Sequence, residues 1–166
     1  IDSDGWFHTG DIGMFEDNRF LKITDRKKEI FKTSGGKYIA PVMIENKLKE
    51  SPFIEQALVI GENQKFASAL IVPAFAFLKD YCSKKGIAFT SNEDIIKNET
   101  IKARIKEEIE KTNNELAQYE RIKCPELLPR EWTIDKGEMT PKLSLKRKVI
   151  MTANKELVDK IYGGKE

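Results

Sequence analysis

Asp11 is the first residue of the chain whose type and position could do chemistry. It follows Thr9-Gly10, a dipeptide that favours a tight turn. A carboxylate can accept two hydrogen bonds at once, which matches the adjacent 2′ and 3′ hydroxyls of a ribose. The alternative is a structural aspartate that bonds only to the backbone of its own turn. A bare Thr-Gly-Asp leaves both interpretations open.

Lys146 lies in a second candidate segment, near the other end of the chain. Its ammonium group could bridge carboxylate and phosphate oxygens, where it would stabilise the charge that develops during phosphoryl transfer. Lys142, Arg147 and Lys148 lie close to it in the sequence. A solvated basic patch is therefore the alternative.

A third candidate segment is the loop Thr33-Ser34-Gly35-Gly36, which lies between two short runs of β-forming residues. Two glycines permit positive φ and a tight reversal, and they allow a backbone to approach a thin ligand closely. An ordinary hairpin turn would explain the same pattern. Together, the three segments suggest a nucleotide site beside a mobile loop.

Four motifs give these segments a family resemblance. They are Trp6-Phe7-His8-Thr9-Gly10-Asp11, Asp25-Arg26-Lys27-Lys28-Glu29, Ser34-Gly35-Gly36-Lys37-Tyr38-Ile39-Ala40-Pro41 and Thr140-Pro141-Lys142-Leu143-Ser144-Leu145-Lys146. The set resembles the motifs of the adenylate-forming enzyme superfamily, and its residues are most similar to those of the long-chain fatty acyl-CoA synthetases. Many relatives have Ser-Gly-Lys where this chain has Ser144-Leu145-Lys146, and the leucine agrees with the long-chain branch.

The resemblance implies that three residues act in forming an acyl-adenylate. Asp11 would bind the ribose of AMP. Arg26 would bind the same ribose and adjoining phosphate oxygens, a task that suits a planar charged donor. Lys146 would be the catalytic residue when a fatty carboxylate attacks the α-phosphate of ATP and releases pyrophosphate.

The resemblance also implies a second step, in which the acyl group is transferred to CoA and AMP is released. Lys28 occupies the position of the family's hinge, about which the C-terminal domain rotates between the two steps. The alternative is one exposed lysine in a basic run. Gly35 and Gly36 would line the pantetheine channel, and Lys37 is a candidate for the CoA phosphates.

These roles imply a division into two domains, with ATP, Mg²⁺ and CoA as the bound groups. Residues 1–27 would be the last hairpin of a larger N-terminal adenylation domain, which would bind most of the Mg²⁺·ATP. Residues 28–166 would be the mobile C-terminal lid. Because the chain begins with Ile1 directly before a motif, we expect an excised piece that is inactive alone.

Two alternatives to a long-chain fatty acid–CoA ligase remain open. The first keeps the architecture but activates a medium-chain, aryl or amino acid, since no acyl-pocket residue is visible. The second is a small basic module, built on residues 142–148, that binds RNA or a membrane surface. It lacks aromatic residues that could stack beside those lysines. Acyl chain length and oligomeric state cannot be read from these residues.

The composition excludes several other kinds of site. A net charge of +2 in 166 residues lacks the strong basic excess of a dedicated nucleic-acid binder. Cys82 and Cys124 lie far apart without neighbouring histidines, so we expect reduced packing residues and no metal site. His8 is the single histidine. Because there is neither a long apolar run nor a signal-peptide pattern, we expect a cytoplasmic protein, with peripheral membrane contact left open.

The elements that must position these residues follow from the residue patterns. Strands are expected at 7–9, 13–15 and 20–24, with a hairpin around 16–19, and at 29–32 and 37–39 around the glycine loop. The apolar runs 57–60 and 67–72 predict an antiparallel pair in the core, and 124–128 predicts a third strand.

Helices are expected at 41–50, where Pro41 suits the first turn, and at 74–85, where Gly86 is a C-terminal stop. Ser91 or Asn92 would cap one long amphipathic helix to about residue 119, and 148–161 would form the last helix. Because strands and helices alternate without a regular βαβ repeat, the expected fold is α+β, a small sheet with packed helices, preceded by the hairpin remnant.

Overall fold

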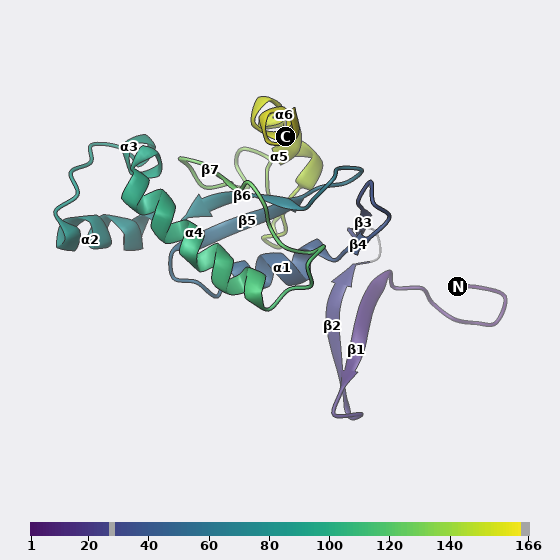
Figure 1. The fold of residues 1–166 in the computed structure, drawn as a ribbon. Coiled ribbons are helices and arrows are strands. Elements are labelled where there is room, and N and C mark those ends of the chain that lie inside the picture. Colours follow the sequence, from purple (N-terminus) through teal and green to yellow (C-terminus); the bar gives the residue numbers. More distant parts are fainter. Residues whose placement is uncertain (27–28, 164–166) are drawn as a thin grey trace.

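The structure is a computed structural model that describes residues 1–26 and 29–163 (Figure 1). The strands are β1 (Asp11–Glu16), β2 (Phe20–Arg26), β3 (Phe31–Lys32), β4 (Tyr38–Ile39), β5 (Ile54–Ile60), β6 (Ser68–Pro73) and β7 (Glu126–Leu127). The helices are α1 (Pro41–Leu48), α2 (Phe75–Lys85), α3 (Asn92–Lys97), α4 (Glu99–Asn114), α5 (Arg147–Ala153) and α6 (Lys155–Gly163). This small sheet with packed helices confirms the α+β prediction.

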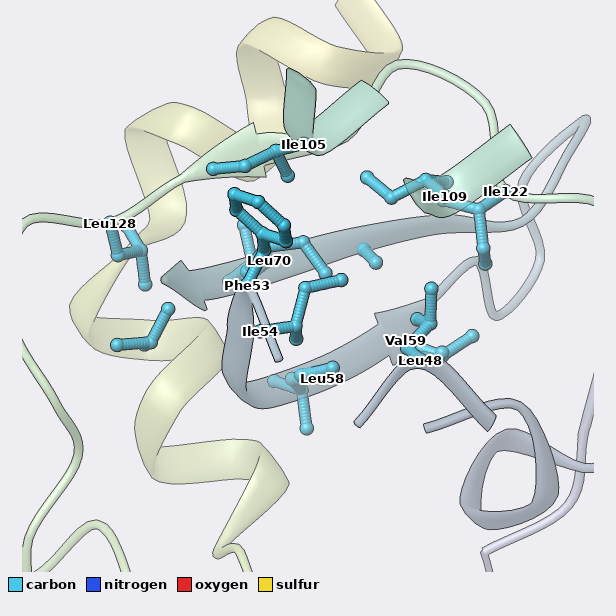
Figure 2. Packing of buried hydrophobic residues seen from close by; sticks show 14 of the residues in the cluster. Leu48, Phe53, Ile54, Leu58, Val59, Leu70, Ile105, Ile109, Ile122 and Leu128 are labelled. Atoms are coloured by element: carbon cyan, nitrogen blue, oxygen red, sulfur yellow. The ribbon is translucent and has the colours of Figure 1, made fainter. Parts of the chain in front are cut away.

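The core is built on a three-stranded sheet with the strand order β5-β6-β7. β5 and β6 pair antiparallel, as predicted, with Leu58 opposite Leu70, whereas β6 and β7 pair parallel. Every residue of β6 is buried. Figure 2 shows side chains of both long strands gathered with Ile105 and Ile109 of α4. At about 25 cal/mol for each Å² of apolar surface removed from water, this cluster is the main source of stability.

Helix α1 begins, and helix α2 ends, where the sequence signals predict. Pro41 occupies the first turn of α1, where its missing N–H leaves no helical hydrogen bond unmade. Gly86 ends α2 in the left-handed conformation, with φ of 67°. In Figure 1, α2 and α3 lie at the end of the molecule opposite the β1–β2 hairpin.

The prediction of one long helix from residue 91 or 92 to 119 was wrong. The segment forms α3 and α4, which meet at Asn98. The Asn98 side chain accepts hydrogen bonds from the N–H groups of Thr100 and Ile101, so it caps a new helix while its own backbone is extended. Helix α4 then ends at Asn114, earlier than expected.

Two further predictions need correction. The last helix is divided at Asn154 into α5 and α6, and the Asn154 side chain donates to the carbonyl of Ile150. Residues 7–9 are not a strand, because the first hairpin begins at Asp11. Among the described residues, no helix is both long enough and apolar enough to cross a membrane.

The cysteine prediction was half right. Both thiols are free, and Cys82 is buried in the core. Cys124 is exposed, so it is not a packing residue. It lies just before β7 with φ of 49°, and its carbonyl accepts a hydrogen bond from Ser68 Oγ at 2.9 Å.

The two hairpins differ in how much of them the core covers. The β1–β2 hairpin projects away from the three-stranded sheet (Figure 1), and Phe15, Phe20 and Leu21 are all more than 60% exposed. In the β3–β4 hairpin, by contrast, Ile39 is fully buried. Its loop is tied to the β5–β6 turn, because Ser34 N–H donates to the carbonyl of Gln64 at 2.9 Å.

The segment from residue 130 to residue 147 is joined to β5 by hydrogen bonds. The Gln56 side chain of β5 accepts from the N–H of Trp132 at 2.7 Å and donates to its carbonyl at 3.1 Å. Arg130 makes two hydrogen bonds, at 2.7 and 2.9 Å, to the carboxylate of the buried Glu138. These contacts fix the path of the chain immediately before Lys146.

Candidate functional site

Asp11 and Arg26 are paired across the first hairpin. Their Cα positions are directly opposite each other in the β1–β2 register, which shifts by a bulge between Ile12 and Gly13. The Asp11 N–H donates to Thr9 Oγ1 at 3.1 Å, so the Thr-Gly turn is closed by the threonine side chain. The backbone therefore brings the two predicted ribose-binding positions together.

Lys28, the predicted hinge, lies outside the residues that the structure describes. So does the side chain of Arg26, although its backbone is described. The hinge and the guanidinium of Arg26 therefore stay sequence predictions.

Asp11 lines a cavity of about 1000 Å³ between the first hairpin and the rest of the chain. Four segments form the other walls: α1, β5, the stretch after β7 and the start of α5. Representative lining residues are Glu45 on α1, Gln56 and Ala57 on β5, Trp132 and Thr133, and Ser144, Leu145 and Arg147. The cavity thus brings Asp11 to the same place as the motif that contains Lys146.

Lys146 sits at the start of α5, in its N-cap position, and is exposed. Its N–H donates to the carbonyl of Glu138 at 2.8 Å, beside a bridge between Met139 and Leu145. The residues on both sides of Lys146 line the cavity, so its backbone lies at the rim. Lys146 itself is not among the residues that line the cavity, and its flexible four-carbon side chain starts from this rim.

The glycine loop lies apart from this cavity. Gly36 has φ of +81°, and its N–H donates to the carbonyl of Thr33 at 2.9 Å, which closes the turn. Gly35 and Gly36 are exposed, and Lys37 Nζ lies 5.7 Å from the centre of the Tyr119 ring. None of residues 33–37 is among the described residues that line the cavity. The structure therefore separates the predicted CoA loop from the predicted adenylate residues.

Glu45 is a buried acidic residue that the sequence interpretation missed. It is 6% exposed and shares the inward face of α1 with Pro41, Ile44 and Leu48. The available signal was its position, because residues 41, 44, 45 and 48 follow the spacing of the apolar stripe. An acidic residue in such a stripe predicts a buried partner.

Arg147 is the partner of Glu45. Arg147 Nη2 lies 2.6 and 2.8 Å from the two carboxylate oxygens of Glu45. Burial raises the pKa of Glu45 to about 7, although the attraction of Arg147 and a hydrogen bond from the N–H of Val59 both lower it. This doubly hydrogen-bonded pair, directly after Lys146, joins α5 to α1 and β5.

Comparison with protein families finds one that covers most of the chain. Residues 28–166 match the family described as "AMP-binding enzyme C-terminal domain". This match begins after the first hairpin.

Curated proteins of known name are similar over nearly the whole chain. A long-chain-fatty-acid–CoA ligase of Mycobacterium tuberculosis, FadD15, is 38% identical over 96% of this chain. Human long-chain-fatty-acid–CoA ligase 1 is 38% identical over 98% of it. The chain spans 27% and 24% of these two proteins, or about a quarter of their length.

Solved structures share the fold. The adenylation domain of a carboxylate reductase from Mycobacterium chelonae superimposes with a TM-score of 0.77 and 22% identity. The match covers 99% of this chain and 24% of that one. At this level of identity, the comparison establishes the fold only.

Proposed function

This chain belongs to the family of AMP-binding enzyme C-terminal domains, and we propose that it is the C-terminal part of an ATP-dependent long-chain fatty acid–CoA ligase. The complete enzyme would join a fatty acid to AMP with release of pyrophosphate, then transfer the acyl group to CoA with release of AMP. The observation that carries the proposal is the identity of 38% to long-chain-fatty-acid–CoA ligases over 96% of the chain or more.

In the first step, Lys146 would act on the reacting phosphate. Attack of a carboxylate on the α-phosphate builds negative charge on phosphoryl oxygens and on the leaving pyrophosphate, and an ammonium group stabilises both. Asp11 would accept hydrogen bonds from the two ribose hydroxyls, with Arg26 beside it. The cavity that Asp11 shares with Ser144, Leu145 and Arg147, the neighbours of Lys146, supports this assignment.

In the second step, the glycine loop would carry the contacts to CoA. Its exposed tip, with Gly35 and Gly36, would approach pantetheine, and Lys37 would bind a phosphate. Because this loop lies apart from the cavity, the two steps would need two orientations of the domain, with Lys28 as the hinge. Residues 1–27 would then belong with the larger N-terminal domain.

Residues 1–26 and 29–163 contain no cluster of three acidic, histidine or cysteine side chains that could hold a metal ion. We propose that the larger N-terminal domain supplies most of the Mg²⁺·ATP site. We also propose the cytoplasm as the compartment.

Substitution of Lys146 by alanine in the complete polypeptide tests the first-step assignment. Single-turnover formation of palmitoyl-adenylate should fall by about 10²- to 10³-fold, because a cation aimed at developing charge is lost. Consumption of pre-made palmitoyl-adenylate by CoA should stay close to the wild-type rate. Equal loss in both steps would reject a role specific to adenylate formation.

The acyl substrate needs a separate test, because the catalytic assignment holds for any acid. The complete polypeptide should release pyrophosphate faster with palmitate than with octanoate, benzoate or an amino acid at equal concentration. A clear preference for one of the other acids would keep the ligase chemistry and reject the long-chain assignment.

A further inference from the structure

Every nitrogen of the Arg147 guanidinium is engaged by protein atoms. Nη2 donates to both oxygens of Glu45, Nη1 donates to the carbonyl of Val59 at 3.0 Å, and Nε donates to Glu29 at 3.3 Å. Glu45 also accepts from the N–H of Val59 at 2.7 Å. We call Arg147, Glu45, Glu29 and the backbone of Val59 the Arg147 clamp.

The charges of the clamp argue against direct binding of a phosphate by Arg147. Two carboxylates face one guanidinium, so the clamp has no surplus positive charge when both are ionised. An anion would have to displace Glu45, which is buried, or compete with Glu29 for the same donors. Arg147 therefore differs from Lys146, whose side chain is exposed.

The clamp fixes the backbone of Lys146 from one side. Arg147 follows Lys146 directly, and its side chain ties that point to α1 and β5. On the other side, the N–H of Lys146 is held by the carbonyl of Glu138, whose own carboxylate is held by Arg130. A lysine side chain is long and flexible, so the position of its backbone determines which space its ammonium can sample.

We propose that Arg147, fixed by Glu45, is a positioning residue that holds Lys146 at the rim of the cavity for adenylate formation. This inference rests on the proposed function of Lys146. Buried ion pairs contribute little net stability compared with apolar residues of similar size, but breaking one leaves an uncompensated charge. The pair is thus well suited to maintaining one arrangement of the segment.

The test uses Arg147→Lys and Glu45→Gln in the complete polypeptide. A lysine keeps the charge of Arg147 but cannot make the paired hydrogen bonds, and a glutamine keeps the shape of Glu45. Each variant should lower single-turnover formation of palmitoyl-adenylate by about 10- to 100-fold, since small displacements of catalytic groups have effects of this size. Consumption of pre-made palmitoyl-adenylate by CoA should be unchanged.

Glu108→Gln is the matched control. Glu108 is 7% exposed and pairs with Arg104 at 2.6 Å on α4, so it is another buried carboxylate–guanidinium pair. Its loss should change adenylate formation by less than about twofold, because distant sites act independently. Thermal unfolding of all three variants shows whether they are folded. An equal kinetic loss in the control would overturn the proposal.

A double-mutant cycle with Lys146→Ala separates positioning from general destabilisation. If Arg147 acts through Lys146, Arg147→Lys should cause no further loss of adenylate formation once Lys146 is absent. If Arg147→Lys lowered adenylate formation by the same factor with and without Lys146, the positioning role would be rejected. A wild-type rate in both Arg147→Lys and Glu45→Gln would also reject it. If Lys146→Ala itself had no effect, the proposed function of Lys146 would fail instead, so the two failures are distinguishable.

Discussion

The segment 138–147 and the loop 33–37, which carry the candidate residues for the two steps, are held in the fold by different means. Side chains hold the first: Glu138 is paired with Arg130, and Arg147 is paired with Glu45. Both carboxylates are buried. The segment thus depends on two buried carboxylates, each paired with an arginine.

Backbone hydrogen bonds, together with the hydroxyl of Thr33, hold the loop 33–37. The N–H of Thr33 donates to the carbonyl of Lys37, and the N–H of Ser34 donates to Gln64, each at 2.9 Å. Neutral hydrogen bonds of this kind each contribute little net free energy, whereas a broken buried ion pair leaves a charge without a partner. The difference teaches that one segment is built for a fixed position, and the other can open locally at lower free energy.

The largest expected effect comes from breaking the side-chain support of the first segment. Glu138→Ala removes a buried carboxylate and leaves the guanidinium of Arg130 and the N–H of Thr133 without it. The free energy of unfolding should fall by about 2–4 kcal/mol, measured by urea denaturation. Asp159→Ala, which breaks the exposed pair with Lys155, is the control and should leave the free energy of unfolding nearly unchanged.

The dependence of stability on pH tests the side-chain support of the segment 138–147 in a second way. The hydrogen bonds from Arg130, together with the N–H of Thr133, hold the pKa of Glu138 below its ordinary value of 4.5. As pH falls, Glu138 therefore takes up its proton in the unfolded chain before it does so in the folded chain. The stability that ionised Glu138 contributes is fully present above pH 4.5, and it is lost as pH falls through the lowered pKa of the folded state. Glu138→Gln should flatten that acid limb of the stability curve, and an unchanged limb would contradict the pairing.

A smaller effect is expected in the glycine loop. Gly36 has positive φ, so Gly36→Ala should lower the free energy of unfolding by about 1–2 kcal/mol. Gly35 does not share this conformation, and a Cβ there would meet its nearest atom, Thr33 Oγ1, at 4.0 Å. Gly35→Ala should therefore be nearly neutral in the same denaturation experiment. Equal losses at the two positions would mean that the loop is held by something other than its turn geometry.

The smallest effect concerns the contact between Lys37 and Tyr119. The two side chains are exposed, and an exposed cation–π contact contributes about 0.5–1 kcal/mol. Lys37→Ala should lower the free energy of unfolding by no more than this. In a Tyr119→Leu background it should have no further effect, and a persistent loss would assign the contribution to another neighbour of Lys37.

The sequence predicts most of the elements because their signals are local. The buried pair β5–β6 follows from apolar runs rich in β-branched residues, and Pro41 and Gly86 mark helix ends. The division at Asn98 was missed because the apolar stripe continues through it from Ile95 to Ile101. An asparagine side chain outweighed that periodicity by capping the next helix, which is a competition between two local signals.

The candidate site was less predictable, because its key contacts are distant in sequence. The spacing around Glu45 indicates that the residue is buried. No sequence signal near it identifies its partner, because Arg147 lies 102 residues later. The common cavity of Asp11 and the 144–147 segment likewise depends on how α1, β5 and the last segment pack. The residues could be chosen from motifs, whereas their arrangement needed the fold.

The two backbone groups of Val59 have a consequence beyond the position of Lys146. β5 is an outer strand of its sheet, and an outer strand with free N–H and C=O groups is a template on which another chain can add a strand. At Val59 both groups are occupied, the N–H by Glu45 and the carbonyl by Arg147. The clamp thus occupies one pair of hydrogen-bonding groups on the outer edge of β5, so an added strand could not pair with the backbone at Val59.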